Sequence, residues 1–209
     1  MTIHLLSVHV GTPALLGERR GEPVTSGIRK QSVSTPIVNV STTNIEGDGQ
    51  ADLVNHGGID KAVYCYSADH DAFWRESLGY EGDGVHSPFG QNLTVSGIDE
   101  TQVCIGDTWL WGDVLLEVSQ PRWPCYKLDM HSGVPLMMKR LIASGFSGWY
   151  LRVIEPGTAP VTGEIEIIHR DPIGLTVSEA FDARRNPKMS PDRYREIMSH
   201  PKLANGWRS

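Results

Sequence analysis

Short apolar segments separated by turn-forming residues dominate the chain. Residues 63–66 are continuously apolar, and residues 3–10 and 33–41 are apolar and partly β-branched, so each predicts a strand. Further predicted strands cover residues 93–95, 102–105, 108–111, 114–118, 148–154 and 163–169. Many short strands at near-regular spacing, with few helices between them, favour an antiparallel barrel or sandwich over a doubly wound sheet.

Helical signals are few and concentrate near the C-terminal end. Ser67 predicts a helix start with the end at Gly79, and residues 134–144 show helical periodicity. Thr176 to Glu179 form a capping-box pattern, and Ser190-Pro191 is typical of a second short helix. We therefore predict a mainly β fold with some α structure, organised as a barrel domain over residues 1–172 and a small helical subdomain over residues 173–209.

Composition and charge narrow the function classes. The chain has 209 residues, 39% of them hydrophobic, with a formal net charge of −6, so no global basic field attracts nucleic acid or an anionic membrane. The three cysteines cannot all pair, and no C-x-x-C occurs, which favours a reducing compartment. No charged leader and no apolar run of about 18 residues is present. We expect a cytoplasmic protein.

Two glycine-containing segments with adjacent cations are weak candidates for an anion site. One spans residues 25–30 and ends in Arg29-Lys30, and the other is His56-Gly57-Gly58-Ile59-Asp60-Lys61. Glycine lets backbone N–H groups approach a ligand closely, and lysine adds positive charge. By spacing alone, a solvated turn is the more common explanation of the first segment, and a tight turn is the more common explanation of the second.

One thiol lies in an unusual setting, in the stretch Gln120-Pro121-Arg122-Trp123-Pro124-Cys125-Tyr126-Lys127-Leu128. The two prolines keep this segment out of a helix interior or a central strand. Arg122 and Lys127 place cations near Cys125, and a cation favours the thiolate that binds metal or attacks electrophiles. A small buried core cysteine is the competing interpretation, and the spacing alone does not decide between them.

Taken together, these motifs resemble the MOSC domain family, in its YiiM-like branch. The resemblance rests on Ser26-Gly27-Ile28-Arg29-Lys30, on His56-Gly57-Gly58-Ile59-Asp60-Lys61, on Gly90-Gln91-Asn92 and on the Pro-Arg-Trp-Pro-Cys segment, and it extends over essentially the whole chain. It implies a barrel of the pyruvate-kinase type, a molybdenum cofactor (molybdopterin) and two-electron reduction of N-hydroxylated compounds such as hydroxylaminopurines.

The resemblance also suggests roles for individual residues. We expect Cys125 to ligate the metal, because a soft thiolate suits molybdenum. We expect the loop from His56 through Gly57 and Gly58 to Asp60 to contact pterin or substrate, with His56 as a proton relay. Asn92 is a candidate orienting group. Four cations are candidates to neutralise the pterin phosphate: Lys30, Lys61, Arg122 and Lys127.

Two positions depart from the family pattern. Gln91 stands where the family usually has glutamate, which removes a carboxylate and weakens the case for acid–base chemistry there. Asn44 replaces a common glycine, a milder change because asparagine tolerates positive φ.

Two other functions fit the same residues. Cys125 would carry a persulfide in a sulfur carrier or cofactor-handling protein, and it would be inert in a non-catalytic ligand-binding barrel. The sequence shows no flavin, haem or iron–sulfur ligand set. An oxidoreductase would therefore need a separate electron-donor reductase besides its N-hydroxylated small-molecule substrate. The sequence leaves open whether the protein forms a homodimer, and we expect no nucleic-acid or membrane partner.

Overall fold

The structure, a computed structural model, describes residues 2–51, 57–79, 87–186 and 188–208. Within these residues, seven strands close into a barrel in the order β12-β8-β9-β10-β6-β7-β1, and β12 pairs again with β1. The barrel strands are β1 (Thr2–Val10), β6 (Val63–Ser67), β7 (Leu93–Ser96), β8 (Thr108–Trp111), β9 (Val114–Pro121), β10 (Trp149–Glu155) and β12 (Gly163–His169). All neighbouring pairs are antiparallel except β6–β7. The predicted mainly β barrel is confirmed.

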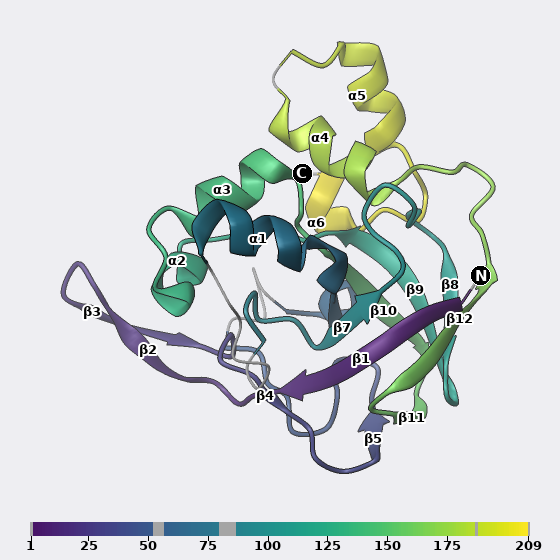
Figure 1. Ribbon diagram of the computed structural model, residues 1–209. Coiled ribbons are helices and arrows are strands. Elements are labelled where there is room, and N and C mark those ends of the chain that lie inside the picture. Colours follow the sequence, from purple (N-terminus) through teal and green to yellow (C-terminus); the bar gives the residue numbers. More distant parts are fainter. Residues whose placement is uncertain (1, 52–56, 80–86, 187, 209) are drawn as a thin grey trace.

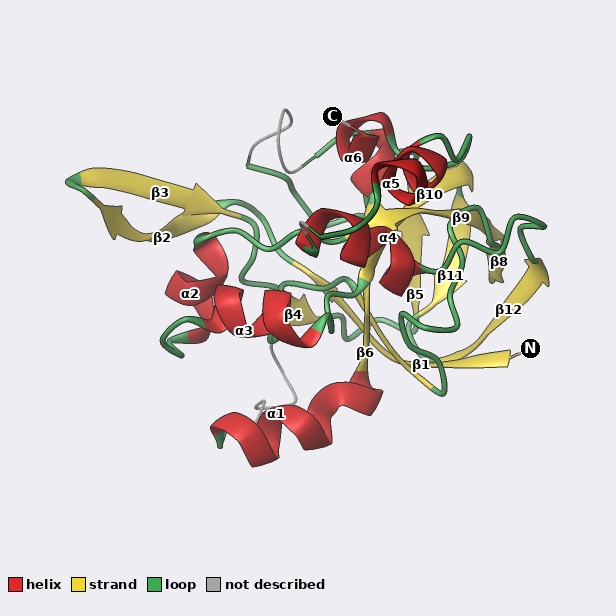
Figure 2. Ribbon diagram, turned by 90° about the horizontal axis from the view of Figure 1, so that it is seen from above, coloured by secondary structure: helices red, strands yellow, loops and turns green. Residues whose placement is uncertain are grey.

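Shorter strands pair with the end of a barrel strand or with one another. β4 (Gln31–Ser32) pairs with the end of β1, and β5 (Ile37–Val40) pairs with β11 (Gly157–Pro160). β2 (Ala14–Arg19) and β3 (Glu22–Ser26) form a hairpin that projects from the body of the molecule (Figures 1 and 2).

Helices gather in two groups outside the barrel (Figure 1). The first group contains α1 (Asp71–Leu78), α2 (Lys127–Ser132) and α3 (Met137–Ser144). The second contains α4 (Val177–Arg185), α5 (Pro191–Met198) and α6 (Asn205–Arg208), which form the predicted C-terminal appendage. The capping box at Thr176 and Glu179 is present, and Ser190 caps α5 ahead of Pro191. The division of the chain at residue 172 stays a prediction.

β6 separates two hydrophobic cores. Val63 and Cys65 belong to the barrel core, whereas Tyr64 and Tyr66 belong to a second core. This alternation follows from the period-two geometry of a strand. The second core also contains Trp74, Phe89, Leu128, Met137 and Leu141, contributed by α1, α2, α3 and a loop. Both faces of β6 are therefore buried, which explains its continuously apolar sequence.

Two of the predicted strands differ from the structure. Residues 102–105 form turns with only an isolated bridge from Cys104 to Thr176, because Asp99 and Asp107 accept local hydrogen bonds from the backbone of Thr101 and Cys104. The strand predicted over residues 33–41 is confined to β5. Cys104 is half-buried instead of a core residue, while Cys65 is fully buried as predicted.

The appendage packs directly on the segment that carries the candidate thiol. The Trp123 ring lies 5.1 Å from the Phe181 ring of α4 and 6.1 Å from the Trp207 ring of α6. Trp207 is 2% exposed, and its indole N–H donates to the Ala180 carbonyl oxygen at 3.2 Å. α4 and α6 thus support the loop that follows β9. Within the described residues, no helix is both long and apolar enough to cross a membrane.

This packing predicts a large stability effect at Trp207. Replacing a buried tryptophan by alanine removes its contacts and leaves a cavity, so Trp207→Ala should lower the free energy of unfolding by about 3–5 kcal/mol. Urea unfolding monitored by circular dichroism measures this change. Tyr194→Ala on α5 is the control, because Tyr194 is 41% exposed and its loss should cost about 1 kcal/mol or less. Equal losses in the two variants would contradict the assigned packing.

Candidate functional site

A pocket lies on the outer side of β6, beside the second core. Four separate segments converge there: residues 26–30, 48–51, 89–92 and 122–127. Lys61, Tyr64 and Tyr150 complete its wall. Of the site residues predicted from the sequence, the pocket brings together Lys30, Lys61, Asn92, Arg122, Cys125 and Lys127.

Glycine allows these segments to pack backbone against backbone. A Cβ atom at Gly27 would overlap the Gly49 carbonyl oxygen, so the first two segments meet only because Gly27 has no side chain. Gly90 has a φ of +79°, and a Cβ atom there would lie 2.5 Å from Ile28 Cγ1. Gly27 and Gly90 therefore serve mainly to bring loops together.

Cys125 lies in the loop between β9 and α2, as the flanking prolines predicted. Pro121 is the last residue of β9 and pairs with Trp149, and after it the chain leaves the sheet. Cys125 is a free, half-buried thiol that lines the pocket. The thiol is thus accessible from the pocket and held by a loop that is fixed at both ends.

Arg122 is a buried cation of the pocket, and it has an unsatisfied hydrogen-bond donor. Its side chain lies over the Tyr64 ring at 5.1 Å, and its backbone N–H donates to the Gly148 carbonyl oxygen at 3.1 Å. Arg122 is 6% exposed, and among the described residues Nη1 has no hydrogen-bond partner. A buried guanidinium N–H without a partner is costly, so this atom is suited to receive an anionic ligand.

Lys30, Asp48 and Asn92 form a buried polar network in the wall of the pocket. The Lys30 ammonium pairs with the Asp48 carboxylate, which also accepts from the Gly11 N–H at 2.9 Å and from Asn92 Nδ2 at 2.9 Å. Burial lowers the pKa of Lys30, and the attraction of Asp48 opposes part of that effect. The site therefore contains a partly destabilised ammonium with a fixed counter-ion.

The amide of Asn92 is fully engaged by the protein. Its Oδ1 accepts from the Tyr64 N–H at 3.0 Å, and its Nδ2 donates to the His9 carbonyl oxygen at 3.1 Å as well as to Asp48. Asn92 thus orients Asp48 and ties β1 to β6. The neighbouring Gln91 accepts from the Phe89 N–H and donates to Thr94, and it does not line the pocket. Its amide therefore has structural hydrogen bonds.

The glycine loop before β6 places fewer of its described residues in the pocket than the sequence suggested. Lys61 lines the pocket, but Gly57, Gly58 and Asp60 do not. The Gln50 side chain holds this loop, accepting from the Gly58 N–H at 3.2 Å and donating to the Lys61 carbonyl oxygen at 3.1 Å.

Asp60 faces a different part of the molecule. Its carboxylate pairs with Arg152 at 2.7 Å, and its carbonyl oxygen accepts from Ser119 Oγ at 2.6 Å. The remaining loop residue of the prediction, His56, lies outside the described residues. Lys127 is at the pocket wall and donates to the Thr25 carbonyl oxygen at 3.1 Å.

Sequence reasoning missed several pocket residues, among them Asp48, Tyr64 and Tyr150. Asp48 lies in a Gly-Asp-Gly turn, a pattern that marks a turn but not a counter-ion. Tyr64 and Tyr150 lie in apolar strands, where alternation could have shown that they share a face opposite the barrel core. Burial raises the pKa of Tyr150, and Arg122 opposes this increase. The phenol therefore stays neutral next to the guanidinium.

The pocket is positively charged in an acidic protein. Four lining cations, Lys30, Lys61, Arg122 and Lys127, against one lining carboxylate, Asp48, give a local formal charge of 4 − 1 = +3, whereas the whole chain has −6. The described residues contain no group of three or more His, Cys, Asp or Glu side chains that could hold a metal ion. A metal at Cys125 would need most of its ligands from a cofactor.

Comparison with known proteins assigns this chain to a family. Residues 52–167, more than half of the chain, match the MOSC domain. The chain belongs to the MOSC domain family. This MOSC protein is 38% identical over 205 residues to the uncharacterized protein YflK of Bacillus subtilis (strain 168), covering 98% of this chain and 91% of YflK.

Two further relatives of this MOSC protein are informative. The crystal structure of YiiM from Geobacillus stearothermophilus superimposes with a TM-score of 0.79 at 30% identity, covering 99% of this chain and 95% of that one. A protein named Reductase from Gibberella moniliformis (strain M3125 / FGSC 7600) is 38% identical over 152 residues, which are 72% of this chain and 27% of that protein. The expected MOSC-type barrel and the YiiM-like branch are confirmed.

The lowered pKa of Lys30 predicts a pH-dependent stability. Between this lowered pKa and the ordinary value of 10.5, the unfolded chain holds more protons at Lys30 than the folded chain does. The free energy of unfolding should therefore rise with pH across that window through this group. We expect the stability of the wild type relative to Lys30→Met to increase as the pH rises toward 10.5, measured by urea unfolding.

Lys139→Met, at an exposed position on α3, is the matched control and should follow the wild-type pH dependence. Parallel stability curves for the wild type and Lys30→Met would show that the Lys30 ammonium is not destabilised in the fold.

Proposed function

We propose that this protein is a molybdenum-cofactor-dependent oxidoreductase that reduces N-hydroxylated bases or related compounds, with Cys125 as the protein's ligand to the metal. One observation carries the proposal: a half-buried free thiol and a buried arginine with an unpartnered N–H line the same cationic pocket. Membership of the MOSC domain family and the similarity to a protein named Reductase support it.

The residues of the pocket fit such a cofactor. A single soft thiolate suits molybdenum that takes its remaining ligands from a pterin dithiolene and oxygen. The orphaned Nη1 of Arg122, together with Lys61 and Lys127, would hold the pterin phosphate. When bound, the cofactor supplies the two-electron reduction.

The remaining chemistry belongs to side chains of this chain. Reduction of an N-hydroxyl group breaks the N–O bond, takes up two electrons and two protons, and releases water. Lys30 lines the pocket and pairs with Asp48, and its ammonium would donate one proton and regain it from solvent. The predicted relay by His56 would deliver another. Trp123, Phe89 and Tyr150 give flat walls against which a planar base would pack.

A separate electron donor completes the proposal. The two electrons must come from outside this chain, whose sequence offers no ligand set for a flavin, haem or iron–sulfur cluster. In the Gibberella protein named Reductase, the region similar to this chain is only 27% of the whole, so that protein has room for further domains. We propose that a reductase supplies electrons to this chain as a separate partner.

The first test measures molybdenum per chain by elemental mass spectrometry, after expression in a host that makes the cofactor. We expect near-stoichiometric molybdenum in the wild type and a loss of at least about tenfold in Cys125→Ser, because the only proposed protein–metal bond is removed. Cys104→Ser is the control, since Cys104 is also half-buried but does not line the pocket. Loaded protein is then assayed for reduction of a hydroxylaminopurine with a chemical electron donor.

The alternatives give different results in the same experiment. A wild type without molybdenum, purified from a host with confirmed cofactor supply, would refute the proposal. Sulfane sulfur on Cys125 in that preparation would indicate a sulfur carrier. An equal loss of metal in the Cys104 and Cys125 variants would rule out specific ligation by Cys125.

A further inference from the structure

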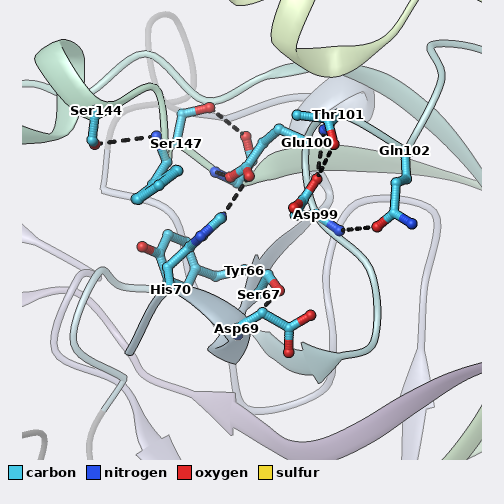
Figure 3. Close-up of polar contacts among 12 residues, drawn as sticks. Tyr66, Ser67, Asp69, His70, Asp99, Glu100, Thr101, Gln102, Ser144 and Ser147 are labelled. Carbon is cyan, nitrogen blue, oxygen red and sulfur yellow. Dashed lines mark hydrogen bonds and ion pairs between the residues drawn. The ribbon is translucent and has the colours of Figure 1, made fainter. Parts of the chain in front are cut away.

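Glu100 and His70 form a buried pair that the proposed chemistry does not use. His70 Nε2 lies 2.6 Å from Glu100 Oε2, and the two side chains are 6% and 3% exposed. The His70 ring also stacks on Phe146, with ring centroids 3.8 Å apart, and Figure 3 shows it directed at the Glu100 carboxylate. A carboxylate removed from water is stable only when it is paired and hydrogen-bonded. The arrangement around Glu100 is therefore tightly defined.

The second oxygen of Glu100 holds the turn that precedes β10. Glu100 Oε1 accepts from the Gly148 N–H at 2.7 Å. Gly148 has a φ of +66°, and a Cβ atom there would overlap the Cys65 carbonyl oxygen, so the turn lies directly against β6. The carboxylate thus connects His70, which precedes α1, to a turn with little freedom to move.

The same turn contacts two residues of the pocket. The Ser147 carbonyl oxygen accepts from the Tyr64 hydroxyl at 2.8 Å, and the Gly148 carbonyl oxygen accepts from the backbone N–H of Arg122 at 3.1 Å. Tyr64 and Arg122 in turn contact each other, with the guanidinium carbon 5.1 Å from the ring centroid. The turn therefore holds the main chain of Arg122 and the hydroxyl of the ring on which its guanidinium rests.

We propose that Glu100, held by His70, is a positioning residue that sets the orientation of the Arg122 guanidinium in the pocket. The inference rests on the proposed function, in which Arg122 binds the anionic part of the cofactor. Glu100 is absent from the pocket lining, so it acts through the Ser147–Gly148 turn.

The Tyr64 phenol keeps its proton in this arrangement. The pKa of Tyr64 is raised, mainly by burial, while Arg122 opposes the increase. Tyr64 consequently stays protonated and keeps its hydrogen bond to Ser147.

The experiment titrates cofactor-free protein with pyrophosphate by isothermal titration calorimetry. Glu100→Ala removes the acceptor of the Gly148 N–H and should raise the Kd by about tenfold or more. Glu100→Gln keeps a side-chain oxygen for that N–H and should stay within about threefold of the wild-type Kd. Recovery by glutamine separates positioning of Arg122 from a requirement for negative charge.

A matched control breaks another buried histidine–carboxylate pair. His200 Nε2 lies 3.3 Å from Asp171 Oδ1, with side chains 1% and 9% exposed, and neither residue lines the pocket. Asp171→Ala should leave the Kd for pyrophosphate unchanged. An equal weakening in Asp171→Ala and Glu100→Ala would indicate general destabilisation and overturn the inference.

Hydrogen–deuterium exchange provides a second readout that does not depend on a ligand. Glu100→Ala should increase exchange in peptides covering residues 144–150 and 120–126, and Asp171→Ala should not. Wild-type affinity and wild-type exchange in Glu100→Ala would overturn the inference alone. A wild type that binds no pyrophosphate would instead remove the anion site of the proposed function, and with it the role of Glu100 in positioning that site.

Discussion

Burial of β6 on both faces is the constraint on which the rest of the structure depends. Val63 and Cys65 fill the barrel, while Tyr64 and Tyr66 need cover on the outside. α1, α2 and α3 provide this cover, and Trp74 donates its indole N–H to the Tyr66 hydroxyl at 2.6 Å. The segment that leads from β9 into α2 is thereby brought against the outer face of β6. Cys125 and Arg122 reach Tyr64 because a second core must exist there.

The pocket combines rigid backbone with a few charged groups. Its walls come from loops that meet at glycines, so their spacing depends on backbone contacts and little on side-chain conformation. Its cations are restrained differently: Lys30 by Asp48, Lys127 by a carbonyl oxygen, and Arg122 by an aromatic ring. Arg122 alone among these three has a buried N–H without a partner in the described part of the chain, which distinguishes it as the group prepared for a ligand.

The sequence predicted the barrel and the position of the thiol because both depend on local signals. Strand alternation, the prolines around Cys125 and the capping box at Thr176 are each short-range patterns. The role of Asp60 was beyond such signals, since its pairing with Arg152 joins residues that are 92 positions apart. Asp48, Glu100 and the two tyrosines were missed for the same reason. Their importance comes from contacts between distant segments, which composition and spacing do not encode.

The hairpin of β2 and β3 contacts the segment that carries the thiol. A two-stranded ribbon is only marginally stable alone, and this one rests on the segment after Cys125. The Arg19 guanidinium lies 4.0 Å from the centroid of the Tyr126 ring, and Lys127 holds the Thr25 carbonyl oxygen. Both anchors are within two residues of the thiol. The hairpin is thus anchored both near its turn, at Arg19, and near its base, at Thr25, so its placement depends on the same short segment that carries the thiol.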